Sequence, residues 1–183
     1  MIESYVNQRG IDIFHLSDGL YMVNHITGAM ASWMWNSMDA NQKEEFEIIY
    51  GVDDAFNGFV SEIRASDHCA AFFDCTEMCC MMWAGWQKVS VLGNRRVRTL
   101  GCVCSEYAKK HMFKFVKHSK ECRDAFELME PKEATEIYVF ITESFKQSRE
   151  WAIRICGLKH ECSCVGGKLA GDFVCYKHVY GED

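Results

Sequence analysis

The residues best suited to chemistry are cysteines at alternate positions of two apolar runs. Cys102 and Cys104 alternate in one run, and His160, Cys162 and Cys164 alternate in the other. Alternate residues of a strand point to one face, so either group could contribute to a zinc site, which favours four nitrogen and sulfur ligands. Structural zinc sites usually use C-x₂₋₄-C knuckles, however. The spacing therefore favours core or half-buried thiols, and we predict no metal site.

A nucleophilic role for Cys102 or Cys104 is the other chemistry open to these thiols, because a thiolate can accept an acyl group. Buried cysteines in strands more often serve as small hydrophobic residues. The chain has 11 cysteines, an odd number that excludes complete internal pairing. Its N-terminus lacks the pattern of a signal peptide, so we expect reduced thiols in a cytoplasmic protein.

Composition limits the class of protein and its partners. The chain has 183 residues, 49% of them hydrophobic, which favours one domain with a single core. We expect no membrane segment, because no apolar run is long enough to span a bilayer. The net charge of −6 makes nucleic-acid binding improbable, although one predicted helix carries a basic face. That face consists of Lys109, Lys110, Lys114, Lys117, Lys120 and Arg123.

The N-terminal part, residues 1–66, is predicted to be mainly helical. Gly28–Met38 and Asn41–Tyr50 are expected helices, and Asp53 or Asp54 could cap a third that runs to about Ile63. The apolar segment Ile11–Leu16 is interpreted as the start of another helix, with a break at Ser17, Asp18 and Gly19. Only Ile2–Val6 is predicted as a strand in this part of the chain.

Residues 67–183 are predicted to form a sheet with helices. Three strand-like runs joined by short turns indicate an antiparallel meander: Cys69–Asp74, Met78–Val91 and Val97–Cys104. A long helix is expected over Ser105–Met129, with Ser105 as its N-cap. Thr135–Val165 follows as a central strand apolar on both faces, a helix closed by Gly157 and a second strand. The last strand is Asp172–Tyr180. This order predicts an α/β fold with a mixed, mostly antiparallel central sheet flanked by helices.

This order of elements resembles the GNAT (Gcn5-related N-acetyltransferase) fold. The C-terminal part carries the resemblance: a strand, a helix ending at Gly157–Leu158, a strand, a glycine-rich turn and the closing run FVCYKHV. Members of the family commonly have Gly-Phe after that helix, and Leu158 stands in for the Phe here. The resemblance covers about Cys69 to Tyr180. Within the family, the chain is similar to small, divergent GNAT-like proteins of tailed phages. The resemblance implies a single GNAT-like domain over residues 1–183.

The resemblance implies an N-acyltransferase that uses acetyl-CoA and transfers the acetyl group to an amine acceptor. The implied cofactor-binding residues are Gly101, Cys102, Val103, Cys104 and Ser105. Direct attack of an amine on a thioester needs a base for the ammonium proton and an acid for the leaving thiolate. Glu77 and Glu143 are the candidate bases, and Ser144 and Ser148 the candidate acids.

Two departures from the family pattern support an alternative function. No second glycine follows Gly101 at the spacing of the usual pyrophosphate loop, and Ile153 lies where many members carry a tyrosine acid. An isoleucine cannot donate a proton. The alternative is a non-catalytic GNAT-like phage protein that acts by binding a protein, either as a virion component or as an inhibitor of a host factor in the host cytoplasm. The acceptor, the protein partner and the oligomeric state stay open.

Overall fold

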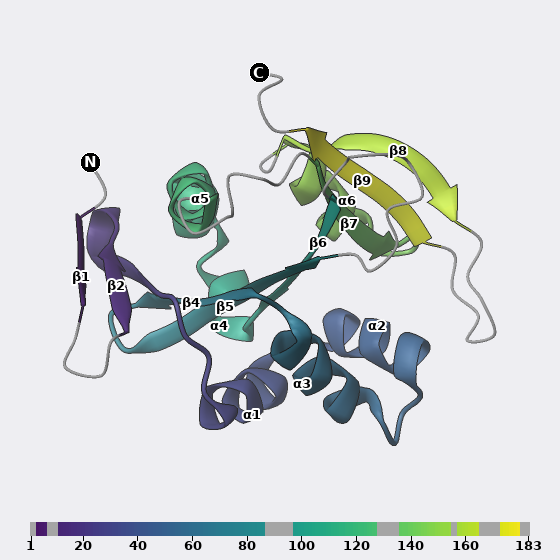
Figure 1. Cartoon of the computed structure of the whole chain (residues 1–183), viewed down its shortest axis with the longest axis horizontal. Coiled ribbons are helices and arrows are strands. Elements are labelled where there is room, and N and C mark those ends of the chain that lie inside the picture. The colour runs from purple at the N-terminus through teal and green to yellow at the C-terminus, as the bar shows by residue number, and fades with distance from the viewer. Residues whose placement is uncertain are drawn as a thin grey trace.

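The computed structural model describes residues 3–6, 11–86, 97–127, 136–154, 157–164 and 173–179. Figure 1 shows one curved sheet with helices on both of its faces. Three N-terminal helices lie on one side of the sheet, and the longest of the described helices crosses the opposite side. None of the helices that the structure describes has the length and apolar composition to span a bilayer.

The chain begins with three antiparallel strands, which corrects the helix predicted over Ile11–Leu16. They are β1 (Glu3–Val6), β2 (Asp12–His15) and β3 (Leu20–Val23), and each pairs with the next. β2 and β3 form a hairpin whose turn holds Asp18 at φ 56° and Gly19 at φ 77°. An Asp-Gly pair between two apolar runs favours such a turn, because both residues tolerate positive φ. The turn therefore makes both runs strands of one hairpin.

The three predicted helices of the N-terminal part are confirmed. They are α1 (Gly28–Ser37), α2 (Ala40–Tyr50) and α3 (Ala55–Ala65). Asp39 caps α2 through a hydrogen bond from the Asn41 amide, and Gly51 ends it at φ 85°. The helices bury one face against the sheet. Their core includes Met34, Phe46, Phe59, Met81, Trp83 and Val103.

The predicted meander is also confirmed, as β4 (His68–Asp74), β5 (Glu77–Trp86) and β6 (Val97–Cys104). All pair antiparallel, and β3 joins the outer side of β4. Cys75, at φ 53°, forms the first turn of the meander. The predicted turn at Leu92–Asn94 lies outside the described residues.

The predicted long helix is broken into α4 (Glu106–Lys110) and α5 (Met112–Glu127), and this corrects the expectation of one continuous helix. His111 interrupts it at φ −107° and ψ 26°. Tyr107 and Lys114 lie on either side of the break, and both bind the Asp74 carboxylate, at 3.1 and 2.7 Å. In a straight helix, residues seven positions apart lie about 10 Å apart along the axis. The break lets both side chains meet at one carboxylate.

The C-terminal unit follows its predicted order: β7 (Glu136–Thr142), α6 (Lys146–Arg154), β8 (Lys159–Cys164) and β9 (Phe173–Val179). Gly157 adopts the left-handed conformation expected after α6, at φ 67°. Phe140 is 44% exposed, so β7 is not covered on both faces as its sequence predicted. The described strands form a single sheet in the order β1-β2-β3-β4-β5-β6-β7-β9-β8. The predicted mixed, mostly antiparallel sheet flanked by helices is confirmed.

Candidate functional site

β6 and β7 form the one parallel pair among the described strands, and their pairing is short. It runs from Val97 opposite Glu136 to Thr99 opposite Tyr138, three pairs in all. Beyond it, Leu100–Cys104 pairs only with β5, and Val139–Thr142 only with β9. The two strands therefore part toward their C-terminal ends and leave two facing edges. An extended ligand can add to such edges through backbone hydrogen bonds.

The last residues of β6 show which side of the strand each backbone amide faces. The Ser105 amide donates to the Cys79 carbonyl at 2.8 Å, on the β5 side, whereas the Cys104 amide donates to Gln42 Oε1 at 2.9 Å. Successive residues of a strand point their amides to opposite sides. The amides of Leu100 and Cys102 therefore point the same way as that of Cys104, away from β5 and toward the parted side.

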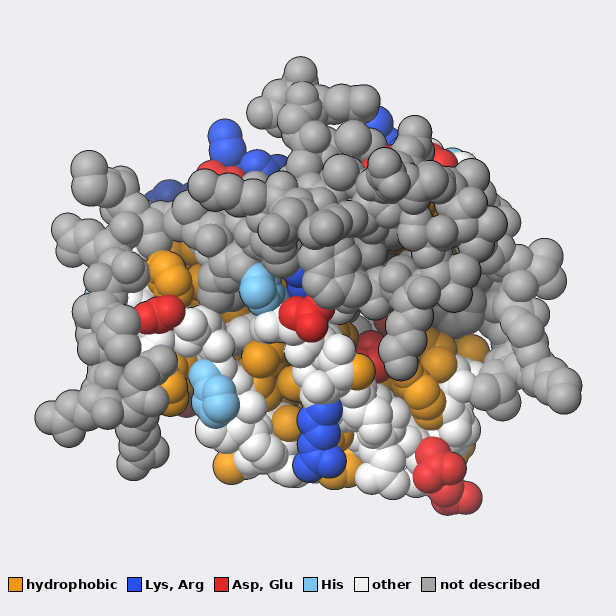
Figure 2. Space-filling model, viewed as in Figure 1, with side chains coloured by type: hydrophobic (Ala, Val, Ile, Leu, Met, Phe, Trp, Pro, Cys, Tyr) orange, Lys and Arg blue, Asp and Glu red, His pale blue; other side chains and the backbone are white. Residues whose placement is uncertain are grey.

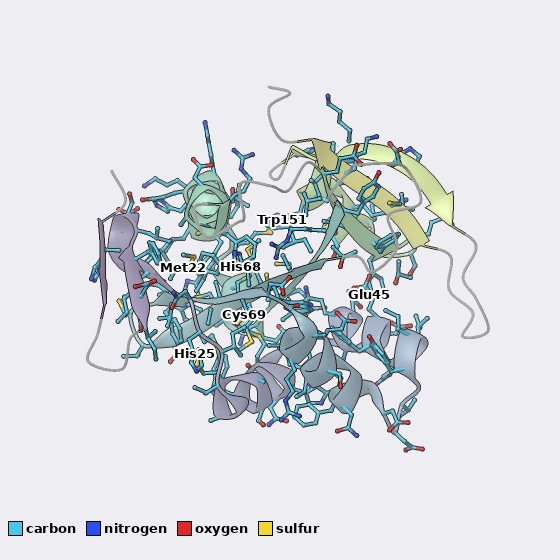
Figure 3. All side chains as sticks on the ribbon, viewed as in Figure 1. Met22, His25, Glu45, His68, Cys69 and Trp151 are labelled. Carbon is cyan, nitrogen blue, oxygen red and sulfur yellow. The ribbon has the colours of Figure 1, made fainter. Side chains whose placement is uncertain are left out.

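Helix α2 lies across the ends of both strands. Gln42 accepts from the Cys104 amide of β6, and Glu45 Oε1 accepts from the Thr142 amide of β7 at 2.8 Å. Gln42 and Glu45 are three residues apart, a spacing that places them on one face of the helix. Figure 3 labels Glu45 on the side of α2 toward the C-terminal strands. One helix face thus joins the two parted strands at the open end.

Burial raises the pKa of the Glu45 carboxyl above its ordinary value, and the hydrogen bond from the Thr142 amide opposes this only in part. The Glu62 carboxylate on α3 adds like-charge repulsion in the same direction. Glu62 is itself held by the Tyr50 hydroxyl at 2.7 Å and by Trp83 Nε1 at 3.2 Å. A carboxylate with a raised pKa is a better proton acceptor near neutral pH than a solvated one.

Trp83 covers the glycine of β6. Gly101 lies directly opposite Trp83 on the paired strands, and a Cβ added at Gly101 would meet indole Cε2 at 2.2 Å. The indole packs edge-on against Phe59, with 5.7 Å between ring centroids. Gly101 is therefore required by the packing of Trp83, on the face of the sheet that α1, α2 and α3 cover.

The predicted catalytic residues occupy different places around this end of the sheet. Glu143 directly follows Thr142 at the end of β7, and Glu77 begins β5; both are exposed. Ser148 is half-buried in the first turn of α6, and Ser144 is exposed before it. Glu143 is the nearest in sequence to the Glu45 contact. The roles of all four stay predictions.

The predicted cofactor residues Gly101, Cys102, Val103 and Cys104 lie along the parted stretch of β6. Ser105 is fully buried, and its own groups are engaged within the protein. Its hydroxyl donates to the Met78 carbonyl at 2.9 Å and accepts from the Ala108 amide as the cap of α4. Ser105 is therefore the N-cap that its sequence predicted, and these bonds occupy both its amide and its hydroxyl.

The cysteines meet in a way the spacing did not indicate. Cys102 and Cys104 gather with Cys80 of β5, and the three sulfurs lie within 4.8 Å of one another. Hydrogen bonds from Cys102 and Cys80 hold the pKa of the Cys104 thiol well below its ordinary value. His160 is exposed on β8, at the edge of the sheet, and β7 and β9 separate that strand from β6. The side chains of Cys162 and Cys164 lie outside the described residues.

Glu45 is the residue that sequence reasoning missed. Its neighbours place it beside Phe46, on the polar side of a predicted amphipathic helix, where a solvated carboxylate is the ordinary expectation. The contact that distinguishes it, with Thr142, joins residues 97 positions apart. No local pattern encodes that contact.

No family model matches the sequence, and no curated protein matches it. Solved structures do match the fold. An aminoglycoside N(6′)-acetyltransferase from Legionella pneumophila superposes with a TM-score of 0.65 at 7% identity, over 90% of this chain and 94% of that one. A protein from Desulfovibrio desulfuricans described as an acetyltransferase of the GNAT family gives 0.57 at 10% identity, over 87% and 98%.

A third structure contains a cofactor. The YncA acetyltransferase of Salmonella typhimurium, solved with acetyl-CoA, gives a TM-score of 0.50 at 8% identity, over 90% of this chain and 96% of that one. At these identities the likeness concerns the fold. The chain has the fold of the GNAT acetyltransferases, as its order of elements predicted.

Proposed function

We propose that this protein is an N-acetyltransferase that transfers the acetyl group of acetyl-CoA to an amine acceptor. The observation that carries the proposal is the parting of β6 and β7 beside the half-buried carboxylate of Glu45. The solved structures of the same fold support it, because they are described as acetyltransferases, one of them with acetyl-CoA. The proposal goes beyond fold in assigning the reaction to particular residues of this chain.

The edge of β6 fits the amide-bearing arm of coenzyme A. The backbone groups of Leu100 and Cys102 face the parted side, where an extended chain with its own amides could pair with them as a short additional strand. Gly101 and Val103 complete this stretch, and Cys104 ends it with its amide held by Gln42. Acetyl-CoA would supply the acetyl group as an activated thioester.

The reaction needs a proton acceptor beside the amine. The amine nitrogen forms a bond to the carbonyl carbon, the carbon–sulfur bond breaks, and the thiolate that leaves takes up a proton. Glu45 would remove the ammonium proton, since burial raises its pKa toward neutrality. The amide of Cys102 would stabilise the negative charge that develops on the carbonyl oxygen. Glu143 is the second candidate base, and Ser148 and Ser144 are candidate acids.

The charge of the chain favours a cationic acceptor. Its net charge of −6 attracts amines that carry several positive charges. Polyamines and aminoglycosides belong to this class, and an aminoglycoside is the substrate in the description of one solved structure with this fold. In the view of Figure 2, the described surface interleaves hydrophobic and polar side chains, with Lys and Arg scattered among them.

Calorimetric titration of the reduced protein with acetyl-CoA tests the proposal, with CoA as the comparison ligand. Micromolar binding, about −8 kcal/mol, is expected. Turnover is then measured as release of free CoA thiol in the presence of a panel of cationic amines. Absence of binding at millimolar acetyl-CoA would rule out the proposed N-acetyltransferase activity.

A second candidate function is protein binding without catalysis. The Cys104 amide already donates a hydrogen bond to Gln42, so it is not available to bind a cofactor. The start of α5 also exposes Met112, Phe113 and Val116, with Phe113 89% exposed. Adjacent exposed apolar side chains of this kind often mark protein interfaces. If acetyl-CoA does not bind, a Phe113→Ser variant that loses a captured partner while keeping its fold supports this candidate.

A further inference from the structure

Three cysteines meet on the α5 side of the sheet because of strand register. Cys80 of β5 lies directly opposite Cys104 of β6, and Cys102 lies two residues before Cys104. Side chains at alternate positions of a strand share a face, and direct cross-strand neighbours lie closest of all. The hydrogen-bonded ladder of β5 and β6 therefore fixes the three sulfurs as one triangle.

The size of that triangle suits a metal ion. The Cys80 and Cys102 sulfurs are 3.4 Å apart, and all three sulfurs lie within 4.8 Å of one another. With metal–sulfur bonds of about 2.3 Å, three thiolates around one ion are separated by about 3.8–4.0 Å. The Cys80–Cys102 separation is shorter than this value and the other two separations are at most 4.8 Å, so shifts of less than about 1 Å would complete the site.

We propose that Cys80, Cys102 and Cys104 form a binding site for one thiophilic metal ion, zinc(II) or copper(I). Thiolates are the ligands that these ions prefer. Copper(I) is satisfied by three sulfurs, whereas zinc would take a fourth ligand, either water or the thiol of Cys122, which packs on the same side of the sheet. Each thiol that binds as a thiolate releases its proton to solvent, and no electrons are transferred.

Cys80, Cys102 and Cys104 are less buried than the cysteines at the centre of the core. Cys79, next to Cys80 but on the opposite face, is fully buried, and so is Cys175 of β9. Cys80, Cys102 and Cys104 are each partly exposed. The metal site uses side chains on one face of β6, whereas the proposed cofactor contacts use its backbone edge.

Metal titration of the full-length, reduced and chelator-stripped protein tests the site. Zinc(II) and copper(I) are titrated separately against a chromophoric chelator, and bound metal per chain is measured by elemental mass spectrometry. The variants are Cys102→Ser and Cys104→Ser. Cys75→Ser is the matched control, because it removes an exposed thiol from the β4–β5 turn, outside the cluster.

We expect one ion per chain in the wild type and in Cys75→Ser, and binding weaker by about a hundredfold or more in the other two variants. Preference for one ion identifies the metal. Equal binding by all variants, or no bound ion in the wild type, would overturn the proposal. Alkylation of the wild type, mapped by peptide mass, does not depend on how the variants fold. Bound metal must protect Cys80, Cys102 and Cys104 but not Cys75, and equal labelling with and without metal would also overturn it.

Discussion

The Glu45 carboxylate accepts a hydrogen bond from the Thr142 amide at 2.8 Å, and this contact places an acidic side chain at the end of the strand that has parted from β6. An amide at a strand end could equally be satisfied by water. A partly buried glutamate there costs desolvation, which is why its pKa is raised. Carboxylates whose pKa is raised by burial are common at catalytic sites.

The Glu45→Gln variant separates the chemical role of this residue from its structural one. Glutamine keeps an oxygen for the Thr142 amide but cannot accept a proton at neutral pH. With an amine found by the acceptor panel, we expect kcat to fall by about 10²–10⁴-fold while the Kd for acetyl-CoA stays unchanged. Stopped-flow detection of free CoA thiol gives the rate, and calorimetry gives the Kd.

Glu44→Gln is the control for that experiment, because Glu44 is exposed on the same helix. It changes the net charge of the protein by the same amount and should leave kcat unaltered. If Glu45→Gln retains the wild-type rate, Glu45 is not the base, and Glu143→Gln becomes the next variant. Unchanged rates in both would leave Glu77 as the remaining predicted carboxylate.

Ser105 is expected to act in folding and not in cofactor binding. Its hydroxyl caps α4 and holds the Met78 carbonyl, so Ser105→Ala should lower the free energy of unfolding by about 1–2 kcal/mol. The Kd for acetyl-CoA should not change. Urea denaturation and calorimetry measure the two quantities. Ser144→Ala, at an exposed position, should alter neither, and weaker acetyl-CoA binding by a folded Ser105→Ala protein would restore the predicted cofactor role.

The sequence predicted the C-terminal unit well because its signals are local. The apolar run of β7 and the left-handed glycine at Gly157 each act within a few residues. The prediction for the N-terminal hairpin is wrong, although the hairpin is also a local structure. Ile11–Leu16 is apolar without a clear period, and Asp18–Gly19 taken alone predicts only a break.

The features of the candidate site could not be predicted locally. The break at His111 accompanies contacts of Tyr107 and Lys114 with Asp74, a residue on another element. The Glu45 contact depends on how helix α2 packs beside β7, and the Cys80–Cys102–Cys104 cluster depends on the register of β5 and β6. The C-x-C spacing did place two of the three sulfurs on one face, but it could not supply the third.

Gly101 should tolerate no side chain. A Cβ there would lie 2.2 Å from the Trp83 indole, whose other side packs on Phe59 and whose Nε1 binds Glu62. Gly101→Ala is therefore expected to lower the free energy of unfolding by about 1–3 kcal/mol through overpacking. Urea denaturation measures it. Gly28→Ala, where a Cβ meets no atom within 4 Å, is the control and should change stability by less than about 0.5 kcal/mol. Equal stability of the two variants would mean that Trp83 moves freely.

The Asp74 carboxylate should make stability depend on acid pH. Burial alone would raise its pKa, but hydrogen bonds from Lys114 and Tyr107 hold that pKa below the ordinary value. The folded protein thus binds this proton less readily than the unfolded chain, whose aspartates titrate near pH ~3.9. Its contribution to the free energy of unfolding is complete above that pH and is lost as the pH falls through the folded pKa.

Asp74→Asn measures that contribution directly. The difference in unfolding free energy between wild type and variant should be largest near about pH 6 and should shrink below about pH 4, since protonation then weakens the same bonds in the wild type. Urea denaturation across this range gives the difference at each pH. Asp53→Asn, at an exposed position, should show no such trend. A difference for Asp74→Asn that stays constant with pH would mean that the ion pair with Lys114 contributes nothing to folding, and that the Asn side chain acts only through altered packing.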